Sequence, residues 1–111
     1  MSRSKSLETL KFEAMRKHID EKLRVNPAWV ERAILALYSR QTADEQATME
    51  TGHNNARGFN KPDAKRMSFV ASFLLSGKHL TREKALTVYA PKLRKYVNQL
   101  TRIALENENR R

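Results

Sequence analysis

Residues 26–42, NPAWVERAILALYSRQT, constrain the fold most strongly, because their apolar side chains recur at the spacing of one helix face. That face consists of Val30, Ala33, Ile34, Leu37 and Tyr38, with Trp29 beside it. Asn26 is a favourable N-cap, and Pro27 suits the first helical position. We therefore predict that this segment is the central helix of the core.

Three other segments also have helical periodicity: residues 6–24, 60–77 and 81–104. Their predicted N-caps are Ser6, Asn60 and Thr81, and Gly77 is a typical residue to end the second of them. No segment alternates apolar and polar residues as a half-buried strand does. The sequence thus predicts an all-α fold, a small bundle of four to five helices.

The last helical region contains Pro91, which removes one backbone hydrogen bond and crowds the preceding turn. The helix could kink there, or a short helix could end near Tyr89 and a second begin at Pro91. We favour two segments that meet at an angle.

The chain has 111 residues, the size of one domain. We expect residues 1–26 to form a peripheral N-terminal helix, residues 27–104 the helical core, and residues 105–111 a frayed tail. The acidic stretch that follows the central helix lacks a strong period, so we expect one short helical turn from Thr42 or Asp44 and poor order over residues 47–55.

The net charge is +10, with a pI near 10.3, and it is unevenly distributed. Residues 1–26 contribute +3, residues 27–52 contribute −2, and residues 53–111 contribute +9. Such a field attracts polyanions, of which nucleic acid is the first candidate, ahead of acidic proteins and anionic membranes. The chain has no cysteine and no signal-peptide pattern, so we expect a cytoplasmic protein.

The basic half begins at a polar stretch, residues 52–66, GHNNARGFNKPDAKR. Its loop residues Asn54, Asn55, Gly58 and Asn60 are common in turns, so the loop could be a simple joint between helices. Alternatively, its backbone N–H groups, with Arg57 beside them and a helix start after it, could hold a phosphate. Both interpretations remain open from the sequence.

Basic side chains cluster on the two helical regions that follow. Lys61 and Lys65 share a helix face, as do Lys92 and Lys95. Our candidate nucleic-acid contacts are Arg57, Lys61, Lys65, Arg66, Lys92, Arg94 and Lys95. The alternative is a solvated charged face, and the aromatic residues Trp29, Tyr38, Tyr89 and Tyr96 fit core packing better than base stacking.

Catalysis is not indicated. The three histidines, His18, His53 and His79, share no helix face, and no spacing suggests the three or four convergent donors of a metal site. We therefore predict no catalytic residues, no metal and no cofactor.

Four pieces of the chain together resemble a known module: residues 29–46, 54–64, 73–81 and 93–100. They are similar to a small helical module of uncharacterised activity in phage and bacterial proteins, which occurs alone or appended to helicase-type chains. The resemblance implies work near nucleic acid and supplies no residue roles. The polar positions Gln41, Thr42, Asp44 and Gln46 of the first piece could bond to the 52–60 loop and fix its shape.

These observations predict a small basic accessory protein that binds nucleic acid mainly through phosphates, with low sequence specificity. DNA or RNA, single strand or duplex, would fit this pattern. The alternative is a protein-interaction module that docks on a helicase, a polymerase or a host regulator. An exposed apolar patch at Trp29, Phe69 or Phe73 beside the loop would favour that alternative.

Overall fold

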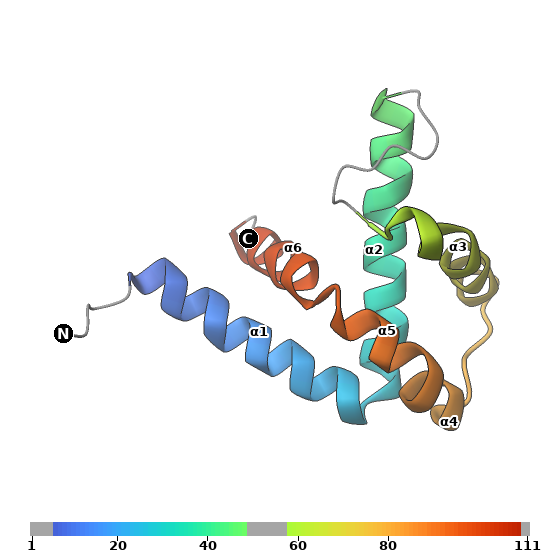
Figure 1. Cartoon of the computed structure of the whole chain (residues 1–111), viewed down its shortest axis with the longest axis horizontal. Coiled ribbons are helices and arrows are strands. Elements are labelled where there is room, and N and C mark those ends of the chain that lie inside the picture. Colours follow the sequence, from blue (N-terminus) through green and yellow to red (C-terminus); the bar gives the residue numbers. More distant parts are fainter. Residues whose placement is uncertain (1–5, 49–57, 110–111) are drawn as a thin grey trace.

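The computed structural model describes residues 6–48 and 58–109, with the side chains of all of these except 42–48 and 109. These residues form five helical segments and contain no strand, so the prediction of an all-α bundle is confirmed (Figure 1). The helices are α1 (Leu7–Val25), α2 (Pro27–Thr48), α3 (Lys61–Leu75), α4 (Arg82–Lys84), the π-helix η1 (Ala85–Tyr89), α5 (Ala90–Arg94) and α6 (Val97–Asn109). Because α4, η1 and α5 follow one another without a break, they count as one segment.

The helices begin where the sequence predicts. The side chains of Ser6, Asn60 and Thr81 each accept a hydrogen bond from the backbone N–H three residues later. Asn26 accepts one from the backbone N–H of Ala28 at 3.0 Å. Gly77 follows α3 with a positive φ of 92°, a conformation that glycine adopts without a steric penalty.

The central helix α2 carries the predicted core face: Val30, Ala33, Ile34 and Leu37 are all buried. It does not end near residue 42 but continues as one helix through Thr48. Alanine, glutamate and glutamine are good helix formers, and no glycine or proline interrupts the segment. The expected separate turn from Thr42 or Asp44 is therefore part of α2, while residues 49–57 lie outside the described residues.

Helix α1 runs antiparallel to α6 and α5, and pairs of contacts recur along it at intervals of four residues. Arg94 Nε donates to Asp20 Oδ1 at 2.9 Å, and Arg16 Nε donates to Asn98 Oδ1 at 2.8 Å. In the next turn, the guanidinium of Arg102 lies 5.9 Å from the centre of the Phe12 ring.

The buried residues of α1 lie in its second half, and Met15 packs partly buried against the core. Ile19 and Leu23 are buried, whereas Leu7 and Leu10 are exposed. The core thus extends past the expected boundary at residue 26 into the N-terminal helix. At the other end, α6 continues as a helix to Asn109 within the expected tail, and Glu106 of α6 pairs with Arg40 of α2 at 2.9 Å.

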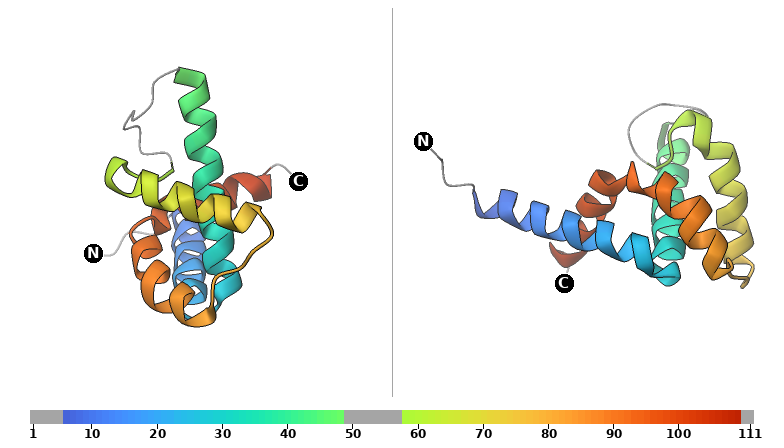
Figure 2. Two further views of the ribbon diagram at one scale, coloured as in Figure 1. Left: turned by 90° about the vertical axis from the view of Figure 1, so that its right-hand side faces the viewer. Right: turned by 60° about the horizontal axis from the view of Figure 1, so that its bottom comes forward.

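The favoured prediction of two segments that meet at an angle at Pro91 is wrong, because α4, η1 and α5 run through Pro91 as one continuous helical segment. The five residues before α5 form a π-helix, in which Ala90 N–H donates to the carbonyl of Ala85, five residues earlier. Since Pro91 has no N–H and its ring crowds the carbonyl four residues before it, a wider turn at this place accommodates it. The change of direction occurs at the turn Lys95–Tyr96 between α5 and α6, where the sequence did not predict one (Figure 2).

None of the helices in the described part of the chain is long and apolar enough to cross a membrane.

Candidate nucleic-acid interface

The described end of the polar loop is a tightly packed joint. Gly58 is buried and has a φ of +74°. A Cβ added there would lie 2.5 Å from Gln41 Cβ and 2.8 Å from the Leu37 carbonyl oxygen, so the backbone of the loop rests directly on α2. Only glycine combines this backbone conformation with such a close approach.

Gln99 of α6 binds both backbone groups of Gly58. The N–H of Gly58 donates to Gln99 Oε1 at 2.8 Å, and Gln99 Nε2 donates to the Gly58 carbonyl at 3.0 Å. One side-chain amide thereby satisfies a donor and an acceptor that the loop would otherwise leave unpaired. The loop is fixed to α6 as well as to α2.

Phe59 and Tyr96 hold the start of α3 in place through a ring contact and hydrogen bonds to Asn60 and Asp63. Phe59 is buried in the core and meets the Tyr96 ring edge to face, with the ring centres 5.5 Å apart. The Tyr96 hydroxyl accepts from Asn60 N–H at 3.1 Å and donates to Asp63 Oδ2 at 2.5 Å. Burial and the bond to Asp63 raise the pKa of Tyr96, so it stays a neutral donor.

Asp63 receives a second partner, Lys95 Nζ, at 2.6 Å. Burial alone would raise the pKa of the Asp63 carboxyl, but the hydrogen bonds from Lys95 and Tyr96 outweigh it and leave the pKa lowered. A carboxylate three residues after the N-cap can complete a capping box by accepting from the N-cap N–H, here that of Asn60. Instead the Asp63 carboxylate faces the turn between α5 and α6, because two better donors converge on it there.

We call this set of residues the loop joint: Gly58, Phe59, Asn60 and Asp63, held by Lys95, Tyr96 and Gln99. Within it, Gly58 and Asn60 act as structural residues, which matches the joint interpretation of the loop. Gln41 also takes part, since it packs under Gly58 and donates to Ser68 Oγ at 3.3 Å. The predicted loop residues Asn54 and Asn55, the predicted contact Arg57, and the side chains of Thr42, Asp44 and Gln46 lie outside the described residues.

The predicted basic contacts divide into two groups. Arg94 and Lys95 are held by carboxylates, Arg94 by Asp20 and Lys95 by Asp63. The hydrogen bond from Arg94 keeps the pKa of Asp20 below its ordinary value. Lys61, Lys65 and Arg66 of α3 are exposed, and Lys92 of α5 is half-buried near the loop joint, where its charge helps to lower the pKa of Asp63.

A larger basic surface extends beyond the predicted residues. Between residues 58 and 84 all six Lys and Arg side chains are exposed, and of the two carboxylates only Glu83 is exposed. We call this surface the α3–α4 face; its cations are Lys61, Lys65, Arg66, Lys78, Arg82 and Lys84. Among the described residues, none of these six pairs with a carboxylate. The last three were not among the predicted contacts, which came from residues 57–66 and 92–95.

An apolar hollow of about 260 Å³ opens on the same face. We call it the aromatic hollow; its lining is Phe69, Val70, Phe73, His79, Leu80, Thr81, Lys84 and Tyr89. Figure 2 (left) looks onto this side of the molecule, where α3 crosses the view and the connection after it leads to α4. Phe69 is 75% exposed.

The connection that borders the hollow is fixed to α2 by Glu31. One carboxylate oxygen accepts from the N–H of Leu80 at 2.7 Å, and the other lies 2.9 Å from His79 Nδ1. These two contacts with Glu31 hold the connection where His79, Leu80 and Thr81 line the hollow. The sequence offered no local signal for this bond, since its partners are 49 residues apart.

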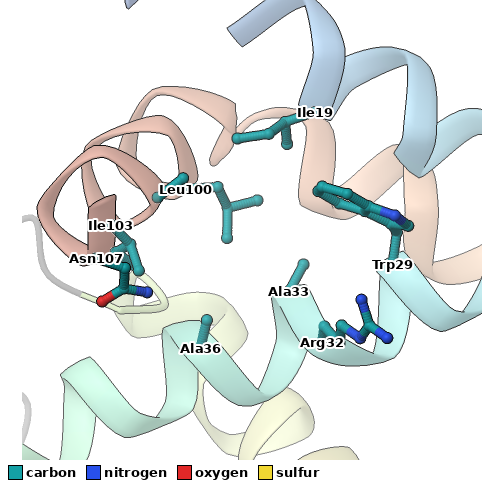
Figure 3. A pocket seen from close by; sticks show the side chains of 9 residues that line it. Ile19, Trp29, Arg32, Ala33, Ala36, Leu100, Ile103 and Asn107 are labelled. Carbon is teal, nitrogen blue, oxygen red and sulfur yellow. The ribbon is translucent and has the colours of Figure 1, made fainter. Parts of the chain in front are cut away.

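A second hollow, of about 150 Å³, lies between α1, α2 and α6 (Figure 3). Its walls are Ile19, Trp29, Ala33, Ala36, Leu100, Ile103 and Ala104, with only Arg32 and Asn107 as polar neighbours. Trp29 is only partly buried and touches His18 edge to face, with ring centres 5.4 Å apart. With so few polar groups, this hollow has no feature that selects a ligand.

No group of three or more His, Asp or Glu side chains that could hold a metal ion occurs among the residues with described positions. Of the three histidines, His18 and His79 lie on α1 and on the connection before α4, and His53 is outside the described residues. The side chains that are brought together at the loop joint bind one another.

Comparison with protein-family models, with curated proteins and with solved structures gives no match for this chain.

Proposed function

We propose that this protein is a small, non-enzymatic accessory protein that binds nucleic acid through phosphate contacts made by the α3–α4 face. The observation that carries the proposal is the charge of that face: six exposed cations against one exposed carboxylate. A cytoplasmic location, where nucleic acid is accessible, belongs to the same proposal.

Lys61, Lys65 and Arg66 are the principal contacts that we propose. They occupy the first half of α3, and Lys61 and Lys65 stand one helical turn apart on its exposed side. Flexible lysines neutralise phosphates as point charges without reading bases, so sequence specificity should be low. Arg94 and Lys95 are secondary in this scheme, because Asp20 and Asp63 already hold them.

A second function, docking on a helicase or another replication or transcription protein, is favoured by one observation. Phe69 is largely exposed beside an apolar hollow, as a binding hot spot on a protein surface is. The aromatic hollow therefore has two candidate occupants, an unpaired base and an apolar side chain. The substitutions described in the next subsection distinguish them.

The proposal is tested by fluorescence anisotropy with labelled single-stranded and duplex oligonucleotides over a salt series. The double variant Lys61→Gln, Lys65→Gln should weaken binding and reduce the slope of log K against log salt by about 1.4 for single strands. That slope change equals two lost phosphate contacts at about 0.7 each.

The matched control is Lys11→Gln, Lys17→Gln, which removes two exposed cations from α1. Both double variants lower the net charge equally, so they share any long-range effect. If the two variants reduce affinity and slope equally, binding is a property of net charge, and the α3–α4 face is not the interface. If the wild type binds no nucleic acid at low salt, the function is not nucleic-acid binding.

A further inference from the structure

The exposed side of α3 has a basic half and an aromatic half. Lys65 and Arg66 are followed one turn later by Phe69, and another turn later by Phe73. Residues three and four apart on a helix are neighbours, so the cations and the rings lie on adjoining parts of one surface. A surface with a basic half beside an aromatic half offers both phosphate contacts and a flat apolar platform.

The two phenylalanines differ in how open their rings are. The Lys78 ammonium lies 5.5 Å from the centre of the Phe73 ring, and Phe73 is only partly exposed. Phe69 is 75% exposed, and the aromatic hollow opens beside it. Phe73 therefore forms a wall of the hollow, and the Phe69 ring is the part available to a ligand.

We propose that the aromatic hollow receives an unpaired base of single-stranded nucleic acid, which stacks on Phe69 while Lys65, Arg66 and Lys84 hold the neighbouring phosphates. This inference rests on the proposed function and adds the class of substrate. In a duplex the bases are stacked on one another inside the double helix and do not reach such a ring, whereas every unpaired base offers it a flat face. The protein should thus prefer single strands to duplexes.

The charges around the hollow favour this occupant over a second copy of the chain. Lys84 lines the hollow, and Lys78 and Arg82 are next in sequence to the lining residues His79 and Thr81. Glu83 is the one exposed carboxylate of the α3–α4 face. Two copies that met here would bring like charges together. A single strand supplies negative phosphates and apolar base faces in the same molecule.

The experiment compares three labelled probes of equal length: a single strand, a duplex, and a single strand with abasic sites at its centre. The variants are Phe69→Ala, Phe69→Leu and Phe69→Trp. Leu75→Ala is the control, because Leu75 is a 64% exposed residue of the same helix that does not line the hollow. Since Phe69 and Leu75 are both exposed, the variants should fold, and circular dichroism and thermal melting check this.

We expect Phe69→Ala and Phe69→Leu each to weaken single-strand binding roughly 5- to 150-fold, the range for the loss of one stacked base. Phe69→Trp should retain or increase affinity, and Leu75→Ala should change it little. The abasic strand should bind the wild type as weakly as the intact strand binds Phe69→Ala. Duplex binding should be the same for all variants.

The inference is overturned if Phe69→Leu keeps wild-type affinity for the single strand, because an aliphatic side chain cannot stack in place of a ring. Equal affinities for strand, duplex and abasic probe, unchanged in Phe69→Ala, would also overturn it and leave the proposed function intact. Absence of binding to all three probes at low salt would refute the proposed function itself. Tight binding of an acidic apolar peptide that depends on Phe69, with no effect of Phe69 on strand binding, would assign the hollow to a protein partner.

Discussion

The loop joint and the α3–α4 face lie next to each other, yet they use polar residues in opposite ways. In the loop joint, polar groups from three parts of the chain bind one another: Gln99 holds Gly58, and Tyr96 connects Asn60 to Asp63. On the α3–α4 face, the six cations are exposed and have no carboxylate partner among the described residues. The described end of the polar motif, residues 58–63, therefore serves the fold, whereas the ligand surface that we propose is a dispersed set of ordinary lysines and arginines.

The largest effect should come from Gly58→Ala. The new Cβ would lie 2.5 Å from Gln41 Cβ and 2.8 Å from backbone atoms of α2, and φ is +74°. Backbone cannot move aside as a flexible side chain can, so we expect a loss of about 3 kcal/mol or more in the free energy of unfolding. Chemical denaturation measures it.

Gly77→Ala is the matched control for this prediction. Gly77 also has a positive φ, 92°, but nothing lies within 4 Å of the position of a Cβ. Only the conformational term remains, about 1 kcal/mol. If both substitutions cost the same, the close packing of Gly58 on α2 does not limit stability, and the loop joint is looser than the contacts imply.

Tyr96→Phe should have the next largest effect. It leaves Asn60 N–H without its acceptor and removes one of the two donors to Asp63, while the buried ring keeps its contact with Phe59. An unsatisfied buried polar group costs about 1–3 kcal/mol. Thermal melting should show the loss, and affinity for nucleic acid should remain within about twofold once the protein is folded. A drop in affinity without a drop in stability would instead place Tyr96 in the interface.

The sequence predicted the parts of this molecule that depend on near neighbours. The caps at Ser6, Asn60 and Thr81 and the core face of α2 follow from residues within one or two turns. The bonds that define the loop joint link residues 32 to 41 positions apart, from Asp63 with Lys95 to Gly58 with Gln99. Spacing along one helix carries no signal for such pairs.

Exposure was the other property that the sequence could not supply. Phe69 belongs to an apolar stripe of α3. Whether such a stripe is buried depends on whether neighbouring helices pack against it. The sequence offered no sign that Arg94 and Lys95 are paired, because the partners Asp20 and Asp63 come from α1 and α3. Their role as nucleic-acid contacts stays a prediction. Arg57, Asn54 and Asn55 stay predictions.

The next largest effect should be on the loss of stability at low pH, which we call the acid limb. The folded pKa of Asp63 is lowered below its ordinary value of 3.8. Its contribution is therefore fully present above that value and is lost as the pH falls through the folded pKa. Asp63→Asn should cost about 1 kcal/mol near neutral pH and make the fall in melting temperature at low pH less steep.

Asp20 has a pKa lowered in the same direction by Arg94, so it supplies the control. The variant Asp63→Asn should keep the part of the acid limb that Asp20 contributes, and the double variant Asp20→Asn, Asp63→Asn should lose both. An acid limb that Asp63→Asn leaves unchanged would mean that the pairing with Lys95 and Tyr96 does not hold in solution.

The smallest effect should distinguish Arg94, which a carboxylate holds, from Lys65, which is exposed. Arg94→Gln and Lys65→Gln each lower the net charge by one, but only Arg94 is bound to a carboxylate, Asp20, at 2.9 Å. Lys65→Gln should reduce the salt slope of binding by about 0.7 to 0.9, whereas Arg94→Gln should leave the slope nearly unchanged and cost at most about 1 kcal/mol of stability. Anisotropy titrations of the two variants over the same salt series provide the measurement. Equal reductions of the slope would mean that nucleic acid displaces Asp20 from Arg94. In that case the interface would continue from α3 onto α5, and the contrast between the loop joint and the α3–α4 face would exist only in the unbound protein.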